Sequence, residues 1–261
     1  MADFMPATTG SRHMRIIPFH FLTFLFLSLA LPRFCNAETV TLMPPDDWPS
    51  ANWMVTSFGS PSVRGVAFAN YQWLEIARTP EEVGSGQVIY TGGSEIESNE
   101  NQFSDFTGSV IIRGAMGPDG GGVILRAASQ KWDESQRYYV AVTTNYDDGQ
   151  AKMGGIGIYT TDGNPFLYQE GTQSLVFKEA SIASKKEYKL LFSANGPVLK
   201  AALCQFNTNT SEYDDEIVSV QIDNAEFIAP GWVGLRGGRY GSDNTFIQFR
   251  NFEIQVGQPS P

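Results

Sequence analysis

Histidine and cysteine are almost absent from this chain. Its 261 residues include two of each. Both histidines, His13 and His20, and one cysteine, Cys35, fall within the first 37 residues, which have the pattern of a cleaved leader. Without imidazole, the remaining chain is excluded from Ser–His–Asp and Cys–His catalysis and from most zinc and transition-metal sites. Cys204 alone cannot form an internal disulfide, so the fold must depend on its core.

A cluster of basic residues is also missing. The chain has 18 Lys and Arg against 28 Asp and Glu, for a net charge of −10. This balance argues against nucleic acid and anionic membranes as partners and leaves neutral partners such as sugars open. Adjacent acidic residues at 44–48, 146–149 and 212–216 supply the oxygen ligands that calcium prefers, without a spaced metal-loop signature. We therefore expect no cofactor, with a structural calcium ion left open.

Long apolar runs are missing except near the N-terminus. Two arginines precede a 16-residue apolar run at 16–31, and Cys35 and Ala37 then supply small residues at −3 and −1 of a cut after Ala37. This pattern is typical of a secretory signal peptide, and the run is shorter than the roughly 20 residues of a membrane span. The sequence predicts a signal peptide over 1–37 and a secreted protein, periplasmic or extracellular, with no membrane contact after signal removal.

Helical periodicity is scarce, and short β-branched and aromatic runs bounded by Gly, Asn and Asp take its place. The predicted strands lie at 108–114, 121–127, 137–145, 154–161, 187–196, 216–223, 231–238 and 244–256. Many strands without crossover helices predict an all-β fold, a two-sheet antiparallel β-sandwich. We expect one domain over 38–256, a loose tail over 257–261, and a monomer.

Alternation along two predicted strands separates their faces. On one strand Leu125 points away from Arg126, and on the other Leu235 points away from Arg236. An arginine in the middle of a sheet either caps the edge or lies on a solvated face. Two such arginines predict one solvated sheet face, which would be the concave face of a curved sandwich.

Two segments carry a resemblance to a known superfamily. They are FSDFTGSVIIRGAMGPDGGGVILRA at 103–127 and GWVGLRGGRYGSDNTFIQFRNFEI at 231–254. Together they resemble the concanavalin A-like (laminin-G-type) jelly-roll superfamily. Within it they are most similar to secreted bacterial domains grouped with 3-keto-disaccharide hydrolases. The resemblance covers residues 85–256 in order.

The matching motifs are mainly structural. Phe106 and Phe252 are expected in the core, and Gly121 and Gly122 in a turn. The resemblance implies a carbohydrate-related function outside the cytoplasm, since the superfamily contains lectins, glycan-binding modules and glycosidases. A fold alone does not choose among these functions, so the site must decide.

The stretch SEIESNE, residues 94–100, holds the candidate catalytic residues Glu95, Glu97 and Glu100. Glucanases of the same superfamily carry a similar carboxylate pattern on a concave strand, and the resemblance implies a nucleophile and an acid/base pair here. Retaining hydrolysis needs two carboxyls about 5–5.5 Å apart. However, Glu97 stands where the glucanases have Asp, and Glu100 reaches the same face only through a β-bulge. The polar surroundings favour a solvated acidic loop.

Aromatic and charged side chains in polar contexts are the candidates for sugar binding, because sugar rings stack on aromatic faces while polar groups bind the hydroxyls. The candidate ligand-binding residues are Arg113, Arg126, Trp132, Asp133, Tyr139, Arg236, Arg239, Tyr240 and Asp243. Each also has a structural alternative, because a loop aromatic can fold back onto the sheet and an arginine can pair with a sheet carboxylate.

The sequence favours an exported carbohydrate-binding module without catalysis, whose partner is a poly- or oligosaccharide. A carboxylate-dependent glycoside hydrolase or 3-keto-disaccharide hydrolase, acting on glycosidic bonds, is the enzyme alternative. A surface or adhesive module that binds another protein is the third class.

Overall fold

β-Strands make up all the regular secondary structure that the structure describes. The structure is a computed structural model, and it describes residues 38–41, 53–58, 62–69, 71–77, 85–90, 102–115, 120–130, 138–144, 154–161, 172–237 and 246–256. These residues belong to one compact unit, Cys35–Pro261. Among them no helix is long and apolar enough to cross a membrane.

One sheet has eight strands. Its members are β1 (Glu38–Thr41), β3 (Ser62–Phe68), β4 (Tyr71–Ala77), β6 (Phe106–Ala115), β11 (Glu187–Asn195), β12 (Val198–Asn207), β13 (Glu212–Ile222) and β15 (Phe246–Val256). Their order is β13-β12-β11-β6-β15-β4-β3, and β1 pairs with β15. All of these pairs are antiparallel.

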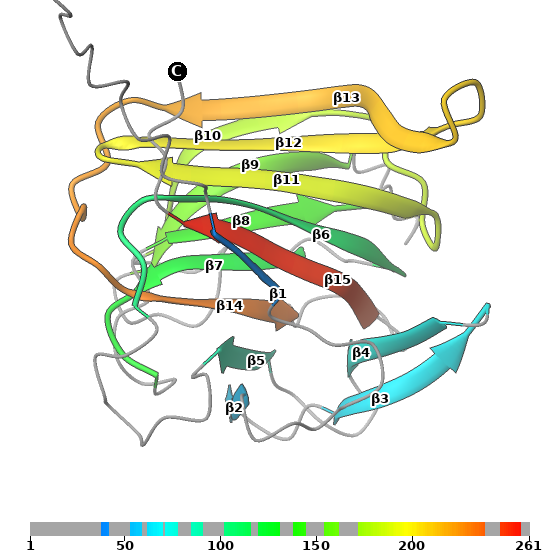
Figure 1. The fold of residues 1–261 in the computed structure, drawn as a ribbon, viewed down its shortest axis with the longest axis horizontal. Helices are drawn as coiled ribbons and strands as arrows, with labels where there is room; N and C mark the ends of the chain where they lie inside the picture. The colour runs from blue at the N-terminus through cyan, green and yellow to red at the C-terminus, as the bar shows by residue number, and fades with distance from the viewer. Residues whose placement is uncertain are drawn as a thin grey trace, which may run out of the picture. The chain divides into compact units, whose positions relative to one another are not determined.

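The other sheet has seven strands. Its members are β2 (Trp53–Phe58), β5 (Ser85–Tyr90), β7 (Gly121–Ala127), β8 (Tyr138–Thr143), β9 (Gly155–Thr161), β10 (Thr172–Glu179) and β14 (Trp232–Gly237). Their order is β10-β9-β8-β7-β14-β5-β2, and every pair is again antiparallel. Figure 1 shows two layers, with β13, β12, β11, β6 and β15 in front of β10, β9, β8 and β7.

The two-sheet antiparallel β-sandwich predicted from the sequence is confirmed. Each predicted strand overlaps an observed one, and the run 121–127 has the same bounds as β7. Gly121 and Gly122 are therefore strand residues, and the turn predicted for them is wrong. A Cβ on Gly122 would lie 2.1 Å from the carbonyl oxygen of Val140 on β8. Glycine is therefore needed here because a side chain would clash with the neighbouring strand.

The core lies between the sheets, because alternate side chains of each strand point into the shared layer. The eight-stranded sheet contributes Phe106, Val110, Ile112, Leu190, Phe192, Leu203, Phe249, Phe252 and Ile254, and the seven-stranded sheet contributes Val88, Val123, Leu125, Val140, Ile158, Val233 and Leu235. The expected core positions of Phe106 and Phe252 are confirmed. Each buried aliphatic or aromatic side chain stabilises the fold by about 1.5–3 kcal/mol. The thiol of Cys204 is buried and free, so the described strands are held by packing.

Arg126 joins several segments at one end of the sandwich. Its backbone has φ 53°, and the β7–β14 register shifts beside it, so its side chain leaves the strand alternation. The side chain is fully buried. Its guanidinium donates to three main-chain carbonyls, those of Ser104 at 2.7 Å, Gly196 at 2.8 Å and Phe227 at 3.2 Å. It also lies 3.3 Å from a carboxylate oxygen of Asp105.

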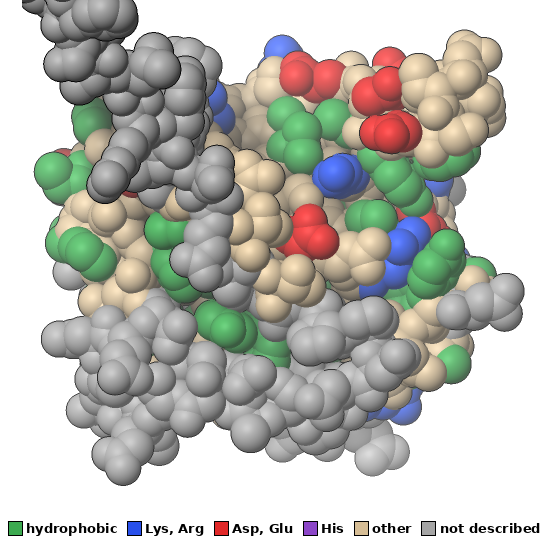
Figure 2. All heavy atoms as spheres, viewed as in Figure 1, with side chains coloured by type: hydrophobic (Ala, Val, Ile, Leu, Met, Phe, Trp, Pro, Cys, Tyr) green, Lys and Arg blue, Asp and Glu red, His purple; other side chains and the backbone are tan. Residues whose placement is uncertain are grey.

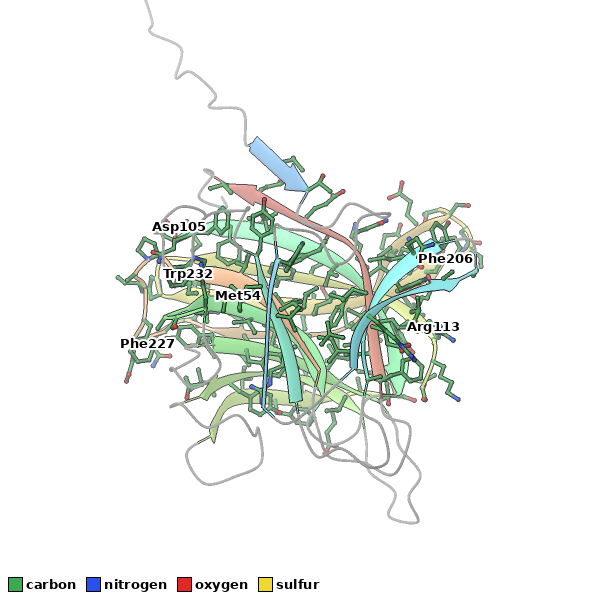
Figure 3. The ribbon with its side chains drawn as sticks, turned by 90° about the horizontal axis from the view of Figure 1, so that it is seen from below. Met54, Asp105, Arg113, Phe206, Phe227 and Trp232 are labelled. Atoms are coloured by element: carbon green, nitrogen blue, oxygen red, sulfur yellow. The ribbon has the colours of Figure 1, made fainter. Side chains whose placement is uncertain are left out.

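Asp105 completes this end clamp. The Gly196 N–H donates to its carboxylate at 2.7 Å, so the Asp105–Arg126 pair binds both main-chain groups of Gly196 in the β11–β12 turn. Gly196 has φ 50°, a conformation that glycine adopts without strain. Burial lowers the pKa of Arg126, and the Asp105 charge opposes that shift. Asp105 and Phe227 lie at the same end of the sandwich in Figure 3.

Replacing Arg126 with Met should destabilise the protein by about 3 kcal/mol, because three carbonyls lose a cationic donor and Asp105 loses its partner. Urea unfolding of both proteins measures the difference. The control is Lys186→Met, which removes an exposed cation with one side-chain hydrogen bond and should cost about 1 kcal/mol or less. Equal effects of the two substitutions would contradict the clamp.

Candidate functional site

Aromatic and aliphatic side chains gather on the outer face of the seven-stranded sheet, opposite the shared core. They are Ile89, Ile124, Ala127, Tyr139, Ala141, Tyr159 and Trp232, and they form a second buried cluster. Strand register explains the grouping, because Tyr139 on β8 pairs with both Ile124 on β7 and Tyr159 on β9. The exposed fraction of each of these side chains is 7% or less.

Arg236 is the charged member of this outer face. It alternates with Val233 and Leu235, which enter the core, so the predicted separation of faces on β14 is confirmed. Its guanidinium carbon lies 5.0 Å from the centre of the Tyr139 ring, within the range of a cation–π contact. The Tyr139 hydroxyl donates to the Arg236 carbonyl at 3.3 Å. Only 1% of Arg236 is exposed, so the expectation that it is solvated is wrong.

On the β7 side of Arg236, the cross-strand positions carry almost no side chain. Arg236 pairs with Gly122, which pairs with Ala141, which pairs with Gly157. Three successive strands therefore present nothing larger than a methyl group in the cross-strand row of Arg236. The adjacent row contains Ile124, Tyr139 and Tyr159. The face thus combines one cation with an aromatic row, next to a row of small residues.

Arg126 and Arg113 do not join Arg236. Arg126 belongs to the end clamp and is fully buried, so its predicted place on a solvated face is wrong. That prediction assumed that side chains alternate strictly between the two faces of the strand. The positive φ of Arg126 interrupts this alternation. Arg113 lies on β6 of the other sheet, and it donates to the Lys185 carbonyl at 3.0 Å and to Gln248 at 2.7 Å. Figure 3 shows Arg113 at the end of the sandwich opposite Asp105.

Eight other predicted site residues lie outside the described residues. They are Glu95, Glu97, Glu100, Trp132, Asp133, Arg239, Tyr240 and Asp243. Their assigned functions stay predictions. The described strands on either side nevertheless fix where the segments that carry them leave the sheet.

These segments leave the seven-stranded sheet at two different ends. Ala127, where β7 ends, lies beside Trp232, where β14 begins, and the segment with Trp132 and Asp133 follows β7. The three-glutamate segment follows β5, whose last residues pair with the start of β14. The segment 238–245 instead follows the far end of β14, about 20 Å away along the strand. The register therefore shows that β5 and β7 end near the start of β14, whereas 238–245 follows its other end.

Trp232 and Tyr159 were not predicted as site residues. A signal for Trp232 was available in the sequence. It lies four residues before Arg236 on one strand, so period-two alternation places both on the same face. Tyr159 could not be found in this way, because its nearness to Tyr139 depends on the pairing of β8 with β9.

Calcium has no evident site in the part of the chain that the structure describes, where no three His, Cys, Asp or Glu side chains gather as metal ligands. Of the three acidic stretches, only 212–216 is described. There Asp215 accepts a hydrogen bond from Gln205 at 2.5 Å and Glu216 from Ser219 at 2.6 Å. The stretches 44–48 and 146–149 lie outside the described residues, so a structural calcium ion stays a prediction.

Comparisons with known proteins bear on the fold. No family model matches this chain, and no curated protein matches it. Solved structures do match. The lumenal domain of VIP36, in a form bound to Ca²⁺ and Man3GlcNAc, has a TM-score of 0.51 at 10% identity, covering 81% of this chain and 90% of its own. The CBM2 module of an evolved Dit protein from Lactobacillus casei BL23 phage J-1 has a TM-score of 0.53 at 10% identity, with coverages of 84% and 96%.

A plant protein is similar to the same degree. Lectin II from Ulex europaeus has a TM-score of 0.51 at 12% identity, and the match covers 85% of this chain and 98% of the lectin. At these identities the likeness establishes a fold in common. The chain is an all-β sandwich of the kind found in lectin domains, which fits the concanavalin A-like jelly roll expected from the sequence.

A separate network of charges surrounds Glu187 on the eight-stranded sheet. The Tyr213 hydroxyl and the Arg250 guanidinium both donate to the same Glu187 oxygen at 2.9 Å. The Arg250 guanidinium carbon also lies 4.1 Å from the centre of the Tyr71 ring. Burial raises the pKa of Tyr213, the hydrogen bond to Glu187 raises it further, and the pKa reaches about 12.

The Tyr213–Glu187 bond should give the protein a pH dependence in the alkaline range. Because the folded-state pKa lies above the ordinary value of 10, its stabilisation is complete below pH 10 and is lost as pH rises towards about 12. Ultraviolet absorbance titration of the wild type minus Tyr213→Phe should isolate one phenol that titrates near pH 12. Tyr71→Phe, at an exposed tyrosine, should leave that phenol in place. A difference titration centred near pH 10 would contradict the network.

Proposed function

We propose that this protein is an exported carbohydrate-binding module without catalysis of its own. In this proposal the signal peptide, residues 1–37, is removed after Ala37, and residues 38–256 form the binding domain. Its partner is a poly- or oligosaccharide, and it acts as a monomer outside the cytoplasm. The sequence motifs at 103–127 and 231–254 are the reason to place it near the 3-keto-disaccharide hydrolase-like domains.

The binding site in this proposal is the outer face of the seven-stranded sheet around Arg236. Because only 1% of Arg236 is exposed, a sugar must open this face to reach the guanidinium. The observation that carries it is the cation–π pair of Arg236 with Tyr139 on the sheet face that the shared core does not use. Aromatic rings accept the apolar C–H face of a sugar, and a guanidinium donates to its hydroxyl or carboxylate oxygens.

Known structures of the same fold support a carbohydrate as the ligand class. VIP36 was solved with Man3GlcNAc, the phage domain is named a CBM2 module, and the Ulex protein is a lectin. These names describe those proteins, and fold alone does not transfer a function. Carbohydrate binding by this chain is proposed because that fold is combined with a sheet face on which Arg236 lies against the Tyr139 ring.

Arg236→Gln should weaken binding to a retained glycan by about tenfold or more, because it removes the charged donor from the proposed site. Retention of the purified protein on cellulose, mannan, laminarin and xylan identifies the glycan, and calorimetry with its soluble oligosaccharide gives the affinity. Arg113→Gln is the matched control on the other sheet and should bind like the wild type. Arg236→Lys keeps the charge and replaces the first variant if that protein fails to fold.

Two results would contradict the proposal in different ways. No retention on any glycan would overturn carbohydrate binding and favour a module that binds protein. Unchanged affinity in a folded Arg236→Gln protein would overturn the site and leave the function standing.

The hydrolase alternative has its own readout. Mass spectrometry of soluble products, with 3-keto-disaccharides among the substrates, should detect no turnover if the protein only binds. Products that disappear in Glu97→Gln would make 94–100 a catalytic segment and would replace binding without catalysis by hydrolysis.

A further inference from the structure

A groove of about 650 Å³ crosses the outer face of the eight-stranded sheet. It is lined by residues of β13, β12, β11, β6 and β15, all among the described residues. Its volume is in the usual range of small-ligand sites, about 300–1,000 Å³. The groove lies on the other side of the shared core from Arg236, so it is a separate surface.

Side-chain size explains why this face is hollowed. One cross-strand row runs Ser219, Ala202, Leu191, Ser109 and Glu253, because each residue pairs with the next. Serine and alanine occupy three of the five positions. These three short side chains lower the row across five neighbouring strands, and the channel runs perpendicular to the strands, about 19 Å from the first strand to the last.

Longer polar side chains form one wall of the channel. The next row runs Gln221, Lys200, Ser193, Thr107 and Gln255 by the same strand pairs. All five have a side-chain group that can donate a hydrogen bond, and four of them can also accept one. This wall therefore presents a continuous series of hydrogen-bonding groups along the whole channel.

The opposite wall carries charges of both signs. Lys189 and Glu216 line it, and both pair with Cys204 on the strand between them. With Lys200 on the first wall and Glu253 at the end of the floor, the groove has two lysines and two glutamates. Figure 2, which views this face, shows basic and acidic side chains intermixed with hydrophobic ones and with the remaining side chains and backbone.

This lining selects one class of ligand. Balanced charge gives no attraction for a polyanion such as nucleic acid, and the polar walls do not suit a lipid chain. A second copy of this chain would bring together two proteins of net charge −10 and would bury charged walls at a desolvation cost.

The four strands β12, β11, β6 and β15 are paired on both sides, so a peptide could not add as a strand to them. A neutral polyhydroxylated chain can bond to every wall residue, and the exposed Leu191 offers it an apolar contact.

We propose that this groove is a second carbohydrate site, which binds a linear oligosaccharide laid across the five strands. With the first site on the opposite sheet, the protein is then bivalent and can join two polysaccharide chains. Two sites on one molecule raise the overall avidity for an insoluble glycan without any new contact at either site.

Backbone amide NMR of the deuterated full chain tests the groove directly. Cellohexaose, laminarihexaose and mannohexaose are titrated separately, and a casein digest serves as the peptide probe. At least one hexasaccharide should shift the amides of Ser109, Leu191, Ala202 and Ser219. Ala202→Trp, which fills the channel floor without entering the core, should weaken that binding by about tenfold or more. Ala229→Trp makes the same change at an exposed position outside the groove and should leave the affinity within about twofold.

The outcomes separate the two sites. Groove shifts that Ala202→Trp abolishes support the inference, and they do so even if Arg236 shows no response and the first site fails. Sugar-induced shifts confined to the Arg236 face would overturn the groove and keep the proposed function. No response of the groove amides to any hexasaccharide, or a response to casein peptides alone, would overturn the inference. If Ala202→Trp does not fold, Ser219→Tyr is used instead. It fills the same channel from β13 and should weaken binding in the same way.

Discussion

The shared hydrophobic layer between the two sheets is the constraint on which the rest of this structure depends. Cys204 is free and buried, and the described part of the chain contains no helix to cover a sheet. Each sheet must therefore give one face of alternate side chains to the common core. That requirement leaves each sheet one outer face that lies outside the shared core, and on the seven-stranded sheet this face carries the second buried cluster. Both candidate binding surfaces are such faces.

The two outer faces differ in chemistry because their outward rows differ. On the seven-stranded sheet, the row through Tyr139 is aliphatic and aromatic, and Arg236 is the cation beside it. On the eight-stranded sheet, three of the five residues in the row through Ala202 are serine or alanine, and polar or charged side chains line both sides of it. One surface offers stacking with a single charge, and the other offers many hydrogen bonds with little stacking. Both arrangements suit sugars, although by different parts of the sugar ring.

Period-two alternation predicted much of the fold and part of the site. It identified the strands that became β6, β7, β8, β9, β11 and β15, and it placed Leu235 in the core opposite Arg236. It failed at Arg126, because one residue with positive φ and one register shift turn the side chain to the end of the sandwich. The many hydrogen bonds of this buried arginine are structural, and no composition or motif signals them.

Strand pairing could not be predicted from the sequence, and it decides which residues meet. Arg113 and Arg236 have similar strand contexts, yet β6 and β14 belong to different sheets. The groove depends on pairing across strands that are far apart in the chain, such as β15 with β6. The same pairing brings the ends of β5 and β7 to opposite sides of the start of β14, which the order of these strands in the chain does not predict.

The most direct test of the central claim is a crystal structure of the protein with a bound oligosaccharide, grown with the glycan that retains it. The account predicts sugar density over the outer face of the seven-stranded sheet, within hydrogen-bonding distance of Arg236. Sugar bound only at an end of the sandwich, away from both outer faces, would contradict it. So would a protein that takes up no glycan at any concentration.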